Sequence, residues 1–210
     1  MNRQLSRMTV AAAFTALTAW SAGCAEDAAP DTAVPSTAAA TTQQSPGHQR
    51  LDQLVGDWTG QKFTYVAGGT PDNPTTGEIT SRWQWIAETG NNFLREEAGG
   101  TLGGNPYYRL GLFGYAPTDD RYEWTTVDNI TPMTMHYQGA RGSGTADGDI
   151  SMSGEFTDPG ALGPQFVGST IAMRTVITLE SADRATMEVH FAPPGQPEIL
   201  ADRVILTRRK

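Results

Sequence analysis

The stretch Ile79-Thr80-Ser81-Arg82-Trp83-Gln84-Trp85 carries apolar or small side chains at its odd positions and polar side chains at its even ones. Successive side chains of a β-strand point to opposite faces of a sheet, so this alternation predicts a strand with one buried face and one solvated face. The same period of two returns near the end of the chain, from Thr170 to Leu179 and from Ala185 to Phe191.

About ten such runs follow one another, separated by Gly, Pro, Asn and Asp. The expected strands are Asp57–Val66, Thr76–Ala87, Asn92–Ala98, Tyr107–Tyr115, Arg121–Asp128, Met133–Ala140, Asp149–Thr157, Thr170–Leu179, Ala185–Phe191 and Pro197–Thr207. Before them, the window from His48 to Val55 has its apolar residues on one helical face, which predicts a short helix. Strands at this spacing predict an all-β fold, and we favour an antiparallel up-and-down barrel of about 8–10 strands over a sandwich because a barrel has no free edges.

Composition and charge exclude several classes of protein. The 210-residue chain carries 23 acidic and 15 basic side chains, which gives a formal net charge of −8. A nucleic-acid-binding protein needs a basic face, so the sequence argues against a nucleic-acid partner. The single cysteine, Cys24, excludes an internal disulfide framework and a cysteine-based zinc cluster.

Residues 1–23 have the pattern of a targeting segment. Two arginines precede an apolar run from Met8 to Trp20, which is too short to span a bilayer as a stable helix. The run ends in Ser21-Ala22-Gly23-Cys24, and small residues directly before a cysteine resemble the lipobox of bacterial lipoprotein signal peptides. This resemblance implies cleavage before Cys24 and acylation of its thiol and new amine, although that family usually has Leu where Ser21 stands. The alternative is a plain secretory signal that is cut after Ala22.

The next segment, residues 24–47, is rich in Ala, Thr, Pro, Ser and Gln, and it holds no aromatic or basic residue. This composition cannot bury enough apolar area to offset its ordering entropy, so we expect a disordered tether. Residues 48–210 then form the folded domain. We therefore expect an exported protein that is lipid-anchored to a bacterial membrane, on its periplasmic or cell-surface side.

The start of the expected domain joins a short helix to a G-x-W motif, through His48-Gln49, Leu51, Leu54-Val55 and Gly56-Asp57-Trp58. With Thr76-Gly77-Glu78, Gly111-Leu112-Phe113-Gly114-Tyr115, Asp119-Asp120-Arg121-Tyr122 and the ending Arg203-Val204-Ile205-Leu206-Thr207-Arg208, it resembles an uncharacterised bacterial family of unknown function that is grouped with the lipocalin-like (calycin) barrels. In lipocalins the Trp plugs one barrel end and an Arg from the last strand lies over its indole. The resemblance implies structural roles for Gly56, Trp58 and Arg203, with Arg208 as the alternative arginine, and it implies ligand binding but no reaction.

Motifs of catalysis or cofactor binding are absent from the sequence. It has no G-x-S-x-G nucleophile elbow, no phosphate loop and no dinucleotide fingerprint. His48, His136 and His190 lack metal-ligand spacing, and the last two share strand phases with polar residues. We therefore expect no metal site and no cofactor such as haem. Glu96 and Glu97 are adjacent on a strand and point to opposite faces, so they do not converge on one pocket.

Aromatic and methionine side chains occupy the apolar phases of the expected strands. The candidate ligand-binding residues are Trp83, Trp85, Tyr107, Phe113, Tyr115, Met135 and Met173, with Arg109 on the phase of Tyr107 and Phe113. Such a wall favours a cavity for a hydrophobic ligand at a barrel mouth, where Arg109 would meet a carboxylate-bearing molecule. The alternatives are a filled core without a cavity, and pairing of Arg109 with Glu123 or Glu97.

Three functions fit these observations. We favour a membrane-tethered lipoprotein that binds a small hydrophobic or amphipathic molecule and is not an enzyme. The second is an enzyme acting on a lipid-like substrate in the barrel, which requires at least two polar groups on inward phases. The third is a structural or partner-binding envelope protein, whose outer face would carry an apolar patch.

Overall fold

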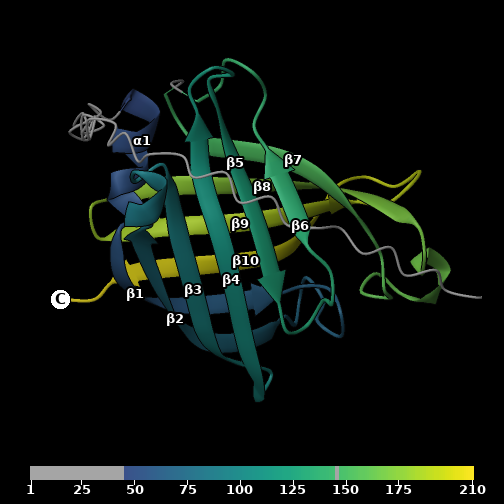
Figure 1. The fold of residues 1–210 in the computed structure, drawn as a ribbon. Coiled ribbons are helices and arrows are strands. Elements are labelled where there is room, and N and C mark those ends of the chain that lie inside the picture. The colour runs from purple at the N-terminus through teal and green to yellow at the C-terminus, as the bar shows by residue number, and fades with distance from the viewer. Residues whose placement is uncertain (1–44, 145–146) are drawn as a thin grey trace, which may run out of the picture. The chain divides into compact units, whose positions relative to one another are not determined.

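Ten antiparallel strands close into one barrel (Figure 1). The computed structural model describes residues 45–144 and 147–210. The strands are β1 (Gly56–Thr64), β2 (Thr75–Trp85), β3 (Phe93–Leu102), β4 (Asn105–Ala116), β5 (Arg121–Asp128), β6 (Met135–Gln138), β7 (Ile150–Thr157), β8 (Thr170–Ser181), β9 (Arg184–Ala192) and β10 (Ile199–Arg208). Each strand pairs with the next one in the chain, and β10 pairs with β1. The all-β up-and-down barrel predicted from the alternation is confirmed.

Burial in β2 follows the predicted phase. Ile79, Ser81 and Trp83 are buried, whereas the polar residues between them are exposed. A slip of one residue against either neighbouring strand would turn the apolar set toward water, so the hydrophobic pattern fixes the register. The largest difference from prediction is in β3, which continues past Ala98 to Leu102 because its following glycines stay paired with β2 and β4.

A short helix, α1 (Pro46–Leu51), and a 3-10 turn, η1 (Asp52–Leu54), lead into β1. The helix begins at Pro46 rather than at His48, because Gly47 already packs on the barrel: a Cβ there would lie 2.5 Å from the Tyr115 ring. The predicted signal segment 1–23, Cys24 and the tether up to residue 44 lie outside the described residues. None of the described helices has the length and apolar character that crossing a membrane requires.

Aromatic side chains fill the barrel end beside α1. The rings of Trp83, Phe113 and Trp124 lie 5.7–6.1 Å apart, and Tyr122 packs on Phe113 at 5.9 Å. Trp58 is 1% exposed, and its indole N–H donates to the Leu54 carbonyl at 2.8 Å. Packing of this density closes one end of the barrel.

Candidate ligand-binding cavity

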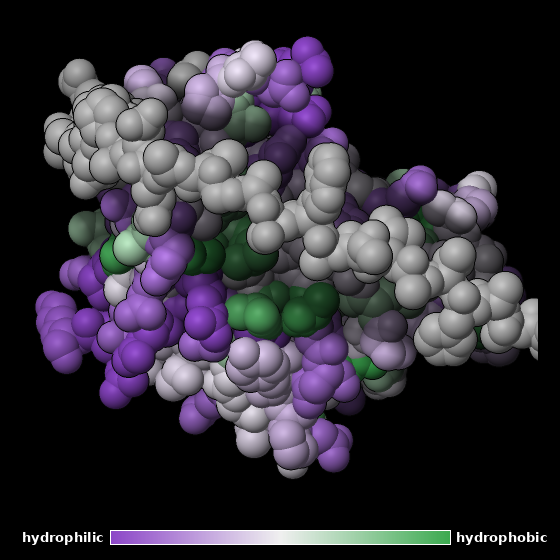
Figure 2. Space-filling view, viewed as in Figure 1, coloured by the Kyte–Doolittle hydropathy of each residue, from purple (hydrophilic) through white to green (hydrophobic). Residues whose placement is uncertain are grey.

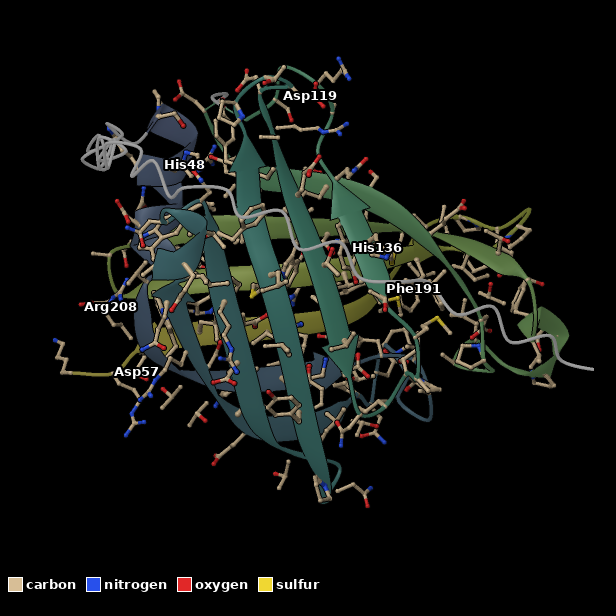
Figure 3. All side chains as sticks on the ribbon, in the orientation of Figure 1. His48, Asp57, Asp119, His136, Phe191 and Arg208 are labelled. Atoms are coloured by element: carbon tan, nitrogen blue, oxygen red, sulfur yellow. The ribbon has the colours of Figure 1, made fainter. Side chains whose placement is uncertain are left out.

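A cavity of about 470 Å³ lies at the barrel end opposite α1. Its wall includes Lys62, Thr64, Val66, Tyr107, Arg109, Thr126, Met135, Tyr137, Phe156, Val189, Phe191 and Asp202. This volume falls within the range of small-molecule sites, about 300–1,000 Å³. In Figure 3, His48 marks the closed end beside α1 and Phe191 marks the cavity end.

Hydrogen bonds order the loops at the cavity mouth. The buried Asp158 carboxylate accepts from the backbone N–H groups of Gly160, Ala161 and Leu162, at 2.9, 2.7 and 3.2 Å. The N–H of Ala67 donates to the Ala161 carbonyl at 2.9 Å, which joins the β1–β2 loop to the β7–β8 loop. These hydrogen bonds fix the positions of the loops at the cavity mouth.

An ion pair between β1 and β10 stands on the cavity wall. Lys62 is 4% exposed, and its Nζ lies 2.9 Å from Asp202 Oδ1 and 5.2 Å from the centre of the Tyr107 ring. The Thr64 hydroxyl donates to the same Asp202 oxygen. The register of β10 shifts between Leu200 and Asp202, so a bulge bends the strand next to this carboxylate.

A second ion pair lies deeper in the barrel. Arg109 Nη2 donates to Glu96 Oε1 at 2.5 Å, and its guanidinium lies 5.0 Å from the centre of the Trp124 ring. Glu96 is fully buried. Burial raises the pKa of Glu96, and the charge and hydrogen bond of Arg109 oppose that shift. Burial lowers the pKa of Arg109, but the charge of Glu96 raises it overall, so the guanidinium stays protonated.

Two tyrosines add hydroxyl groups to the polar part of the wall. Burial raises the pKa of Tyr107, and it raises the pKa of Tyr137 to about 12. Both are therefore neutral phenols at physiological pH, able to donate and to accept hydrogen bonds. The cavity thus combines apolar surface with a few fixed polar groups, which is the usual composition of a small-molecule site.

Of the candidate ligand-binding residues, Tyr107, Arg109 and Met135 line this cavity. Trp83 and Phe113 are fully buried in the aromatic cluster of the closed end, and Met173 is buried in the core. These three residues do not line the cavity. Strand phase shows that a side chain points inward, but it does not show how far along the barrel axis it lies.

Trp85 and Tyr115 are also placed elsewhere, beside α1. The Trp85 indole N–H donates to Asp52 at 2.6 Å, and the Tyr115 hydroxyl donates to Asp120 at 2.6 Å. The His48 ring lies between them, 6.1 Å from Trp85 and 5.4 Å from Tyr115. These two aromatic residues pack against the helix at the closed end and do not line the cavity.

The sequence-based prediction missed Lys62, Glu96 and Asp202. Alternation along the strands could have shown that two of these side chains point inward. Lys62 is on the same face of β1 as Trp58, and Glu96 lies between Leu94 and Ala98 on the buried face of β3. The acidic partners considered for Arg109 were wrong. Glu97 pairs with Arg95 and Glu123 with Arg121, both on the outside of the barrel.

At least two polar groups on inward phases were the condition set for an enzyme, and the four charged side chains of the two ion pairs meet it. These four side chains, however, form two ion pairs, each with a cation and a carboxylate in direct contact. A cation and a carboxylate in direct contact neutralise each other, so the condition alone does not identify a catalytic group.

The cation over Trp58 is Arg208, not Arg203. Arg208 Cζ lies 4.1 Å from the centre of the indole ring, whereas Arg203 Nη2 pairs with Glu188 at 2.7 Å on the outer face. Arg208 continues the inward phase of β10, in which the alternate residues are buried. Gly56 has φ +128°, and a Cβ there would lie 2.7 Å from Arg208 Nη1, so both its conformation and its lack of a side chain are needed.

Two histidines lie on the outer face. His136 is exposed on β6 (Figure 3), with Nδ1 3.1 Å from the Thr125 hydroxyl. His190 Nε2 lies 3.2 Å from Glu188 Oε2. Within residues 45–144 and 147–210, no group of three His, Cys, Asp or Glu side chains is placed to hold a metal ion.

The barrel exterior is mainly polar on the face drawn in Figure 2, with an apolar patch over β4 and β5. Exposed apolar side chains on these and the neighbouring strand are Phe93, Tyr108, Leu112 and Val127. The envelope-protein alternative called for such a patch. Exposed apolar side chains are also common on soluble proteins, so this feature alone does not identify a partner.

The fold is an antiparallel ten-stranded calycin-like barrel with an internal cavity. The chain belongs to the family described as protein of unknown function DUF1579, which matches residues 43–203. The resemblance to an uncharacterised family with a lipocalin-like barrel is thereby confirmed at the level of family and fold. No curated protein is significantly similar to the chain in sequence.

Comparison with solved structures gives matches at low sequence identity. Rv2717c from M. tuberculosis has a TM-score of 0.53 and 16% identity, covering 79% of this chain and 99% of its own. The S-type phycobiliprotein lyase CPES from Guillardia theta has a TM-score of 0.46 and 10% identity, covering 79% and 96%. EF1p2_mFAP2b bound to DFHBI has a TM-score of 0.41 and 12% identity, covering 79% and 100%. At 16% identity, the likeness to Rv2717c extends to the fold alone.

Proposed function

We propose that this protein is a binding module for a small, largely apolar molecule that occupies the barrel cavity. The observation that carries the proposal is a cavity of about 470 Å³ whose mouth is ordered by hydrogen bonds. Met135, Phe156 and Phe191 supply apolar wall. Burial of a ligand there contributes about 25 cal/mol per Å² of apolar area, less the cost of association, so micromolar affinity is expected.

Titration with the neutral apolar fluorophore N-phenyl-1-naphthylamine tests this proposal. Saturable enhancement of its emission is expected for the unmodified protein. Val189→Phe should weaken binding at least about tenfold, because Val189 lines the cavity and the added ring would fill part of it. Val127→Phe is the matched control, since Val127 is exposed on the outer face of β5.

Absence of saturable binding by the folded protein would reject the cavity as a ligand site. Equal weakening by Val189→Phe and Val127→Phe would place the probe on the outer surface instead. Native mass spectrometry of protein purified from its own source would then identify a natural ligand directly, as a mass that is lost on denaturation.

The Lys62–Asp202 pair favours one second candidate, an enzyme that acts inside the cavity. An amine and a carboxylate 2.9 Å apart beside apolar wall could exchange a proton with a bound substrate. The two functions differ in the fate of the ligand. A binding module returns a copurified ligand unchanged after incubation, whereas an enzyme converts it and loses that conversion with Lys62→Met.

We also propose that the barrel is held at a bacterial membrane by acylation of Cys24. The support is the sequence alone: a positive start, a short apolar run and small residues before the sole cysteine. Several acyl chains would hold the protein firmly, because each buried CH₂ contributes about 0.8 kcal/mol.

A further inference from the structure

Every cation of the cavity wall already has a carboxylate in contact. Lys62 and Arg109 are the basic residues of the wall, and they pair with Asp202 and Glu96. Asp128 adds a further carboxylate at the wall, where it accepts hydrogen bonds from the N–H groups that follow it. In the described part of the site, two positive charges therefore face three negative charges, and each positive charge is already paired.

These charged side chains limit which charge a ligand in the cavity can carry. A carboxylate entering it would lose its hydration, find no unpaired cation and lie close to Asp202. An ammonium would lose its hydration and lie close to Lys62, while Asp202 is already paired and Asp128 already accepts two backbone hydrogen bonds. Burying an unpaired charge is costly, whereas an uncharged polar group loses much less on leaving water.

The Lys62–Asp202 pair nevertheless has unused hydrogen-bonding capacity. An ammonium has three N–H donors, and a carboxylate has about four acceptor positions. In the described part of the chain, the polar contacts of this pair are those of Lys62 and Thr64 with one Asp202 oxygen. A ligand group that both accepts from Lys62 and donates to Asp202 would use both remaining capacities.

We propose that the Lys62–Asp202 pair recognises an uncharged head group that both donates and accepts hydrogen bonds, such as a hydroxyl or a primary amide on an apolar chain. The inference rests on the proposed binding function and names its ligand class. The sequence predicts a ligand with a carboxylate head group bound to Arg109. The structure favours an uncharged head group instead, because Arg109 is already bound to Glu96.

Ligands of one chain length separate the possibilities. The probes are 1-decanol, decanamide, decanoate and decylamine, measured at neutral pH by displacement of N-phenyl-1-naphthylamine. The alcohol and the amide should each bind at least about tenfold more tightly than decanoate and decylamine. This ranking is measured on the unmodified protein, so it stands whether or not a variant folds.

Asp202→Asn then tests the residue assignment. The substitution keeps the side-chain shape but leaves the Lys62 ammonium without its carboxylate, so decanoate should gain affinity and overtake the alcohol. Lys62→Met leaves the Asp202 carboxylate without its ammonium, so decylamine should gain affinity and overtake the alcohol. Asp57→Asn is the matched control, because Asp57 pairs with Arg82 on the exposed exterior, at the other end of β1. It should leave the ranking unchanged.

Equal or tighter binding of decanoate or decylamine by the unmodified protein would overturn the inference and leave the binding function standing. So would an unchanged ranking in folded Asp202→Asn. Failure of the fluorophore and of all four ligands to bind would reject the binding function itself, which is a different result.

Discussion

Stacking of Arg208 on Trp58 joins the last strand to the first at the closed end. The guanidinium also donates to the carbonyls of Val55, Gln53 and Ala182, at 2.6–2.7 Å. One side chain therefore binds the segment before β1, the β8–β9 turn and the indole. These contacts explain why an arginine is placed at a barrel end that is otherwise apolar.

Removing either partner should lower the free energy of unfolding. Trp58→Ala should cost about 3–5 kcal/mol, the range for truncating a large buried aromatic side chain. Arg208→Ala should cost about 1.5–3 kcal/mol through lost charged hydrogen bonds. Arg203→Ala should cost under about 1 kcal/mol, because its pair with Glu188 is partly exposed. Urea denaturation measures all three, and equal losses for the two arginines would contradict the assignment.

The buried Glu96–Arg109 pair makes a different prediction at residue scale. Glu96→Leu should lower stability by about 3–5 kcal/mol, because it leaves Arg109 charged and buried without a carboxylate. Adding Arg109→Met should recover much of that loss, since an apolar pair needs no compensation. Strictly additive losses in this double-mutant cycle would show that the two side chains act independently.

At the scale of elements, α1 depends on a buried histidine. His48 lies among Trp85 and Tyr115, and its Nδ1 is 2.8 Å from the Ser45 hydroxyl. Burial lowers the pKa of His48, so the folded protein binds a proton there less readily than the unfolded chain does. The stability contributed by neutral His48 is present above the unfolded pKa of about 6.5 and is lost as the pH falls below it.

Melting temperatures at about pH 7.5 and about pH 5.5 test whether His48 makes the stability depend on pH. The unmodified protein should melt lower at the acidic pH, and His48→Gln should reduce that difference. His136→Gln is the control, because His136 is exposed on the outer face of β6. A pH difference that is the same in all three proteins would exclude His48 as its source.

The bulge in β10 is the second feature at this scale. Plain alternation from Leu206 and Val204 places Asp202 inward, and the register shift then lets Ala201 be buried as well. Nothing in the sequence of β10 marks that extra residue. It is fixed by pairing with both neighbours, including the bond from the Tyr65 N–H to the Ala201 carbonyl at 2.8 Å.

At the scale of the whole molecule, the anchor proposal predicts a change of location. Cys24→Ser should move the protein from the membrane fraction to the soluble fraction, because the thiol that would carry the lipid is gone. Intact-mass measurement of the unmodified protein should show the added acyl chains. A mass without them, or unchanged partitioning of the variant, would refute lipidation.

Local pattern was enough to determine the fold class. Period-two alternation is a property of neighbouring residues, and side-chain direction in a strand has the same period, so strands such as β5 were predicted with their observed bounds. The short helix before β1 also follows from nearby residues. The acidic balance and the single cysteine required no structure either.

Depth along the barrel axis and the choice of partner were decided only by the tertiary structure. Trp83 and Tyr107 both point inward, yet one plugs the closed end and the other lines the cavity, because strand tilt and stagger set their height. Lys62 meets Asp202 although 140 positions separate them, since closure of the barrel pairs β1 with β10. Phase within a strand is local information, whereas these contacts exist only once all ten strands have closed.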